Sequence, residues 1–236
     1  MSSELIRRVV ALLAPPSCVV CRAPVGAEEW TCRRCGCELL GLPRGDSAAF
    51  EYAGPARAMV VALKFNGATA LAGEMAGLMT RRIPEQLAGA EWIVPAPAHP
   101  RRRRVRGYNQ SQLLAAELSR LTGARVLDCL TRAGGGSPQS ELSRGERLAM
   151  QRNSIRVDPR ALRRAGIDPL AEFPTNVVVC DDVRTTGVTL EICAQAIRER
   201  QPELGSEPIR AAVFASARVS GTTDRIARRQ SRRPTG

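Results

Sequence analysis

The sequence predicts an α/β fold, in which a mostly parallel sheet is flanked by helices and preceded by a small cysteine-rich module. Two observations predict it. From Ala48 onward, short apolar runs that are typical of buried strands alternate with segments whose apolar residues recur at helical spacing. This alternation is typical of parallel sheets covered on both faces. Five of the eight cysteines fall within residues 17–38, before the alternation begins.

The composition sets limits on the function. A chain of 236 residues with 44% hydrophobic residues can form one α/β domain with a buried core and an accessory module. Aromatic residues make up only 3%, which disfavours a single-strand binding site built on base stacking. The net charge is +12, and Lys64 is the sole lysine among the basic residues. An arginine excess favours polyanionic partners only weakly, because codon usage can produce it.

No apolar run approaches the roughly 20 residues that a membrane-spanning helix needs. The apolar N-terminal stretch is short, contains arginines and lacks the features of a signal peptide. We therefore expect a cytoplasmic protein without a transmembrane segment. In that compartment, paired cysteines indicate metal or redox chemistry more often than structural disulfides.

The first and last parts of the chain differ from the middle. Residues 3–14 predict an amphipathic helix that ends at Pro15 and Pro16, and its apolar face could pack on its own domain or dock on a partner or a membrane. The polar, arginine-rich end of the chain predicts disorder. The predicted organisation is an N-terminal helix and a four-cysteine zinc module over residues 1–40, a linker over 41–47, an α/β domain over 48–218 and a basic tail over 219–236.

The elements of the α/β domain follow from these patterns in order. Apolar and β-branched runs predict strands at 49–54, 126–132, 154–158, 177–182 and 209–217, and residues 92–100 predict a buried strand that runs into a proline-rich loop. Helical spacing predicts helices at 55–65, 68–82, 109–123 and 187–200. The glycine-rich segment 133–147 and the arginine segment 101–106 have no clear period and predict loops.

The cysteines form a strong zinc pattern. Cys18 and Cys21 make one C-x2-C pair, and Cys32 and Cys35 make a second pair ten residues later. Two such pairs can place four thiolates around one zinc ion, and no coordination position is then left for water, which predicts a structural metal. Cys37 could replace Cys35. The other three cysteines lie in apolar segments and are predicted to be core: Cys129, Cys180 and Cys193.

The most informative stretch is NVVVCDDVRTTGVTL at residues 176–190. An apolar strand ends in Asp181 and Asp182, and a turn with threonines and a glycine leads into the next helix. Ligands of open α/β sheets bind at the carboxyl ends of strands, and a helix N-terminus binds phosphate. The carboxylates can accept hydrogen bonds from ribose hydroxyls while the turn binds a 5′-phosphate. The alternative is a capped helix whose acids are simply solvated.

This stretch closely resembles the phosphoribosyl-pyrophosphate (PRPP) motif of type I phosphoribosyltransferases, with Arg184 as a departure, where it could bind phosphate or point to solvent. A second stretch, IVPAPAHPRRRRVRGYNQSQLLA, resembles the signature of the ComF/GntX family. Both resemblances belong to one family pattern that extends from Cys18 to about Arg218. The residues that match it outside the PRPP motif are Lys64, Arg106, Gly107, Tyr108, Asn109, Gln110, Gln139, Leu142, Ser143, Arg147 and Asn153.

The resemblance implies a type I phosphoribosyltransferase-like fold with a zinc-ribbon-like module. It implies that Asp181 and Asp182 are catalytic residues that hold the ribose. The implied residues for the phosphates of PRPP and its Mg²⁺ are Thr185, Thr186, Gly187, Val188, Thr189, Lys64, Arg104, Arg106, Asn109 and Gln110. Residues 133–147 would form a mobile lid. The arginine segment could equally be an exposed basic loop, and His99 could transfer a proton or have no role.

Two functions follow from the resemblance. The first is a Mg²⁺-dependent phosphoribosyltransferase of nucleoside metabolism that releases pyrophosphate and transfers the phosphoribosyl group to an unknown acceptor. The second is a non-catalytic accessory protein that binds a sugar phosphate or single-stranded DNA. The family association with competence and DNA uptake implies single-stranded DNA and DNA-uptake motor proteins as partners in that case.

Overall fold

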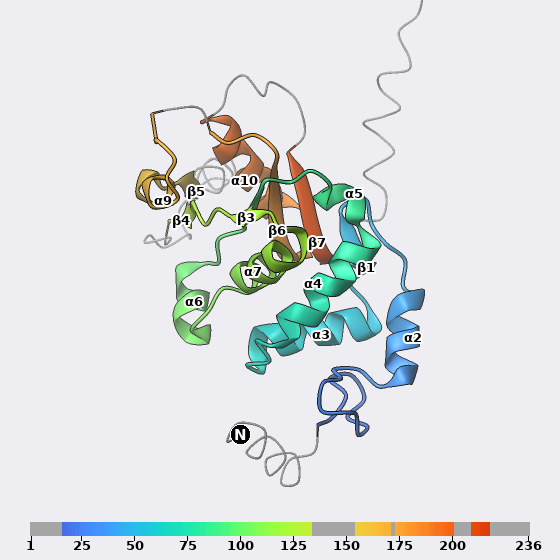
Figure 1. Cartoon of the computed structure of the whole chain (residues 1–236). Helices are drawn as coiled ribbons and strands as arrows, with labels where there is room; N and C mark the ends of the chain where they lie inside the picture. The colour runs from blue at the N-terminus through green and yellow to red at the C-terminus, as the bar shows by residue number, and fades with distance from the viewer. Residues whose placement is uncertain (1–15, 134–153, 171–172, 201–208, 218–236) are drawn as a thin grey trace, which may run out of the picture.

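The structure, a computed structural model, describes residues 16–133, 154–170, 173–200 and 209–217 (Figure 1). The predicted N-terminal helix at 3–14 and the predicted tail at 219–236 lie outside the described residues. The same is true of the predicted lid, except for its first residue, and of the family-matched residues between 139 and 153.

A five-stranded parallel sheet forms the centre of the molecule, which confirms the predicted α/β fold class. Its spatial order is β1-β7-β6-β2-β3, and every neighbouring pair is parallel. The strands are β1 (Ala48–Glu51), β2 (Trp92–Pro95), β3 (Arg125–Val126), β6 (Val177–Arg184) and β7 (Arg210–Ser216).

Helices cover both faces of the sheet (Figure 1). One face packs on α3 (Gly54–Phe65), α4 (Leu71–Arg82) and α7 (Gln110–Thr122), and the other packs on α10 (Val188–Arg198). Side chains alternate between the two cores along β6, where Val178 faces the first core and Val179 faces the second. Burial on both sides explains why this strand is a continuous apolar run rather than an alternating one.

The helix predicted at 109–123 is confirmed in detail. Asn109 caps α7 through its side chain, which accepts a hydrogen bond from the Ser111 N–H group. Gly123 ends the helix in the left-handed region at φ 78°, where residues with a side chain are strained.

Two predictions about local structure were wrong. The strand predicted at 126–132 is not continuous: Val126 is the last residue of β3, and a second strand begins only at Leu130, because the chain leaves the parallel sheet after β3. Leu127 and Cys129 then turn into the second core, and β4 (Leu130–Arg132) pairs antiparallel with β5 (Ile155–Val157) in a separate two-stranded sheet.

The arginine segment is also a helix rather than a loop. α6 (Pro100–Arg106) begins with a proline at its first position, and the His99 Nδ1 atom accepts the Arg101 N–H at 3.2 Å. Gly107 ends it with φ 82°. The other helices among the described residues are α2 (Arg33–Gly41), α5 (Pro84–Leu87) and α9 (Pro159–Arg164). Within the described parts of the chain, no helix combines the length and apolar character needed to cross a membrane.

The cysteine module contacts the main core through α2, where Leu39 is 2% exposed. Arg82 holds the segment that follows. Its Nη2 donates to the Leu42 carbonyl at 2.6 Å, and its guanidinium lies 5.0 Å from the ring centroid of Phe50. The next residues run along β1, with the Glu51 N–H donating to the Pro43 carbonyl at 2.7 Å. The segment that follows α2 is therefore bonded to the edge strand of the sheet.

Candidate functional site

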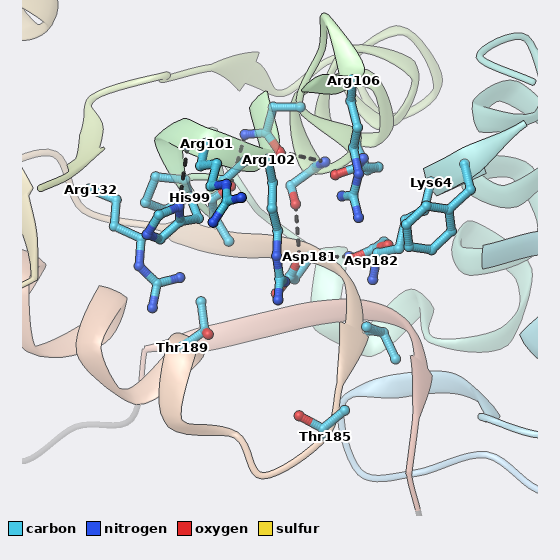
Figure 2. Close-up of a pocket in the computed structure, with 18 of the residues that line it drawn as sticks. Lys64, His99, Arg101, Arg102, Arg106, Arg132, Asp181, Asp182, Thr185 and Thr189 are labelled. Carbon is cyan, nitrogen blue, oxygen red and sulfur yellow. Dashed lines mark hydrogen bonds and ion pairs between the residues drawn. The ribbon is translucent and has the colours of Figure 1, made fainter. Parts of the chain in front are cut away.

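The topology places a crevice at the carboxyl ends of the strands, between β2 and β6. β2 and β6 are neighbours, but the strand added after β2 lies on one side and the strand added after β6 lies on the other. Ligands of open α/β sheets bind at the carboxyl ends of strands where the strand order reverses in this way. A pocket of about 870 Å³ lies there, and loops from both strands line it (Figure 2).

The acid pair lies inside β6, which continues to Arg184 beyond it. Asp182 is 4% exposed, and its Oδ2 atom is 2.8 Å from the Lys64 Nζ atom. The Oδ1 atom of Asp181 accepts a hydrogen bond from the Ser111 hydroxyl at 2.8 Å and another from the Asp182 N–H at 2.9 Å. Two adjacent carboxylates are thus held in different ways, one by a cation and one by neutral donors.

Burial and the negative charge of Asp182 raise the pKa of Asp181 from 3.8 to about 7. The hydrogen bonds from Ser111 and the Asp182 N–H group, and the charge of Lys64, oppose that rise only in part. Near neutral pH, Asp181 can therefore accept or donate a proton.

This raised pKa predicts a pH dependence of stability. The folded chain holds a proton on Asp181 up to about pH 7, whereas the unfolded chain releases it near pH 3.8. The protonated Asp181 therefore makes its full contribution to folding stability below about pH 3.8, and this contribution is lost as the pH rises to about 7. Asp181→Asn should remove this loss, so urea unfolding from pH 5 to 8 should show the variant gaining stability over the wild type as pH rises. A pH-independent difference would contradict the assignment.

The Lys64–Asp182 ion pair gives a second prediction. Lys64→Met leaves a buried carboxylate unpaired, so we expect it to lower the unfolding free energy by about 3 kcal/mol. Asp182→Asn in the same background should restore most of that loss. The matched control is Arg120→Met, which breaks the exposed Arg120–Glu117 pair and should cost less than about 1 kcal/mol. Equal losses for the two single variants would show that the Lys64 pair is not buried in solution.

The predicted phosphate turn lies where β6 meets α10. Thr185 and Thr189 line the pocket, whereas Thr186 and Gly187 in the turn and Val188, the first residue of α10, lie outside its lining. Gly187 has φ 83° and is the N-cap of α10, so a side chain at this position would be strained. Arg184 does neither of the two things expected of it, because its Nη1 atom donates to the Ser47 hydroxyl at 3.1 Å, and it does not line the pocket.

The basic groups of the pocket come from several elements. From α6 and its N-cap, His99, Arg101, Arg102 and Arg106 line it, but the predicted Arg104 does not and is exposed. Arg132, at the end of β4, joins them, and in the view of Figure 2 it lies on the opposite side of the acid pair from Lys64. The pocket therefore places cationic groups around two carboxylates.

The next two predicted residues differ in how their side chains are used. Asn109 donates to the Ala96 carbonyl at 3.0 Å and accepts from the Ser111 N–H at 3.2 Å, so it joins the loop after β2 to α7. Gln110 is 3% exposed, and its Nε2 atom has no hydrogen-bond partner among the described residues. A buried amide donor in the lining is available to a ligand.

The sequence interpretation missed Ser111, the group that contacts Asp181, and Arg132. Ser111 directly follows the matched Arg106–Gln110 run and lies beside the N-cap of a predicted helix, which was a usable signal. Arg132 had none, because its position depends on the β4–β5 pairing between distant segments.

Four cysteines form a second candidate site. The sulfur atoms of Cys18, Cys21, Cys32 and Cys35 all lie within 4.8 Å of one another, and those of Cys21 and Cys32 are 3.6 Å apart. Tetrahedral zinc with Zn–S distances of about 2.3 Å requires sulfurs about 3.8 Å apart, so the group fits a zinc ion. The separation is far too long for a disulfide. Cys37 is exposed and lies outside the group, which therefore includes Cys35.

The thiols of this group affect one another. Burial favours a high pKa for Cys18, but backbone hydrogen bonds from Cys21, Cys32 and Val20 outweigh it and lower the pKa to about 6. Burial and the neighbouring thiols raise the pKa of Cys35 well above its ordinary value. Four adjacent sulfurs can all ionise only if a cation balances their charge, which is the chemistry of a metal such as zinc.

Comparison with known proteins found relatives that share one name. The chain is similar to DNA utilization proteins. It is 27% identical to "DNA utilization protein YhgH" of Salmonella typhi over 220 aligned residues, which cover 79% of this chain and 92% of the relative. The proteins of the same name from Escherichia coli K12 and Shigella flexneri are each 26% identical over the same shares. No family model matches the chain.

Proposed function

We propose that the pocket binds the ribose 5-phosphate part of PRPP and that the chain is a Mg²⁺-dependent phosphoribosyltransferase. The observation behind the proposal is the position of Asp181 and Asp182 beside Thr185 and Thr189, at the point where the strand order of the sheet reverses. Carboxylates accept hydrogen bonds from sugar hydroxyls, and threonine hydroxyls at the start of a helix donate to phosphate.

The ribose hydroxyls would approach the side chains that now contact the acids. Asp181 would accept from one hydroxyl in addition to Ser111, and Asp182 would accept from the other beside Lys64. The 5′-phosphate would lie on the turn from Thr185 to Thr189. The family pattern of the sequence supports the same assignment of these residues.

The diphosphate would face α6, where Arg101, Arg102 and Arg106 line the pocket together with Lys64 and Gln110. Mg²⁺ bound together with the diphosphate beside these residues would neutralise part of its charge. When the bond between ribose C1 and the diphosphate breaks, the acceptor forms the new bond to C1 and pyrophosphate leaves. Negative charge grows on the leaving group, and the arginines stabilise it.

The cysteine module and the chain organisation complete the proposal. Zinc held by Cys18, Cys21, Cys32 and Cys35 would be structural, since all four ligands come from the protein. Residues 1–40 would form the module, residues 48–218 the phosphoribosyltransferase domain and residues 219–236 a basic tail.

Titration calorimetry of the full chain tests the proposal. We expect PRPP to bind with Mg²⁺ more tightly than without it, and more tightly than ribose 5-phosphate does. Binding of ribose 5-phosphate alone would mean that the diphosphate side does not operate. If neither ligand binds, the proposed function is wrong.

A second candidate function follows from the names of the relatives. A cytoplasmic accessory protein in DNA uptake would bind the 5′-phosphorylated end of single-stranded DNA in the same pocket and act with motor proteins. The arginines around the acid pair favour a polyanion. Preference for a 5′-phosphorylated oligonucleotide over a 5′-hydroxyl one, without binding of PRPP, would support this function instead.

A further inference from the structure

One aromatic side chain stands apart from the rest. All eight aromatic residues lie in the described parts of the chain, and only Phe65 is exposed, at 67%. It is the last residue of α3 and lines the pocket. A single exposed phenylalanine is common on protein surfaces, so its surroundings must decide whether it binds a ligand.

Phe65 directly follows Lys64, the residue that contacts Asp182. Neighbouring residues on a helix project in directions about 100° apart. Lys64 therefore reaches the acid pair with a side chain that is 18% exposed, while Phe65 remains at the open side of the same pocket. Any group attached to a sugar held by the acids could lie close to this ring.

A guanidinium group lies over the Phe65 ring, so that the two groups form a stack. The central carbon of the Arg106 guanidinium lies 4.7 Å from the ring centroid of Phe65. Because Phe65 is still 67% exposed, this contact covers only part of it. Val105, which is 82% exposed, also lines the pocket and adds apolar surface to it. Nucleobases stack on aromatic rings and on guanidinium planes alike.

We propose that Phe65 and Arg106 form a stacking surface for a nucleobase attached to the ribose at Asp181 and Asp182. The position of the ribose rests on the proposed function. The ligand class is thus a free 5′-phosphorylated ribonucleotide, because the 5′-terminal sugar of a DNA strand has no 2′-hydroxyl and its 3′-oxygen is esterified. The side chain of a partner protein could also cover Phe65. That alternative would not explain why the Arg106 guanidinium lies on the ring, beside a pocket that holds two carboxylates and further arginines.

The test compares ligands with and without a base. Ribose 5-phosphate, adenosine 5′-monophosphate and a 5′-phosphorylated pentathymidylate are titrated into the wild-type chain and into Phe65→Ala, Phe65→Leu and Phe65→Trp. Phe65→Leu keeps apolar bulk without the ring. Leu121→Ala is the matched control, since Leu121 is 44% exposed and does not line the pocket.

We expect Phe65→Ala and Phe65→Leu to weaken binding of the base-bearing ligands about five- to a hundredfold, with ribose 5-phosphate changed by less than about threefold. Phe65→Trp should keep the affinity, and its added indole fluorescence should be quenched when a base stacks on it. A larger loss for the monophosphate identifies a free nucleotide as the ligand. A larger loss for the oligonucleotide would contradict the ribose part of the proposal, because its 5′-terminal sugar has no free hydroxyl for the acid pair.

Other outcomes separate this inference from the proposed function. If ribose 5-phosphate and the nucleotide bind equally and Phe65→Ala weakens neither, the stacking surface is wrong and the ribose site stands. Equal weakening of all three ligands would also overturn it. If only the oligonucleotide binds and Phe65→Ala weakens it, stacking stands and the ribose site fails. No binding of any probe to the wild-type chain overturns both.

Discussion

Asp181→Asn combined with Asp182→Asn is expected to reduce PRPP affinity by at least about a hundredfold, because each hydrogen bond to a charged group contributes about 1.5–3 kcal/mol. Both carboxylates point into one pocket, and each already binds a donor of the protein at 2.8 Å. An asparagine oxygen is a weaker acceptor than a carboxylate, and the amide nitrogen presents a donor to the sugar hydroxyl instead. Calorimetry with PRPP and Mg²⁺ measures the effect.

The double variant should remain folded. Replacing Asp181 removes a carboxylate whose raised pKa shows that its charge is unfavourable in the folded chain. Lys64 loses its partner but is partly exposed and can be hydrated. Asp46→Asn is the matched control, since Asp46 is exposed and lies outside the pocket lining. PRPP affinity within about threefold of the wild type in the double variant would refute the ribose assignment.

Removal of zinc is expected to unfold the cysteine module while the parallel sheet remains intact. Cys18 and Cys35 are buried, at 0% and 3% exposure, in a segment with few apolar residues of its own. Without a cation, the four close thiols cannot all be ionised, and such modules fold only with their metal. After chelation, hydrogen exchange should lose protection across residues 16–41 and keep it in β2 and β6.

A pair of serine variants sharpens this test. Cys35→Ser removes a member of the sulfur group and should reproduce the effect of chelation, whereas Cys37→Ser should leave the module protected. Metal analysis should find one zinc per chain in freshly purified protein and none in the Cys35 variant. A zinc-free protein with a protected module would contradict the proposal.

The sequence predicted those features that depend on local patterns. The two-sided burial of β6 follows from its continuous apolar run. Both ends of α7 follow from local residues: the Asn109 side chain caps the first turn, and Gly123, which has no side chain, permits the left-handed turn at the end. The cysteine group follows from the spacing of its two pairs. In each case the residues that determine the structure are close together in the chain.

The features that the sequence could not predict depend on contacts between distant segments. Arg184 bonds Ser47 across 137 positions, so its direction could not be read from the motif around it. The two strands within 126–132 separate because β4 pairs with a segment that follows much later. Arg101–Arg106 is rich in one residue type and has no apolar period, which concealed a short helix that its proline and histidine cap specify.

The path of the chain after α2 has a consequence for solubility. β1 is the outer strand of the sheet, and its far side is bonded by the preceding segment through the Gly45 and Glu51 N–H groups. An uncovered outer strand invites pairing with the strand of another molecule. Since α2 and Arg82 fix this segment, we expect unfolding of the cysteine module to uncover the outer strand and to promote self-association before the sheet itself unfolds.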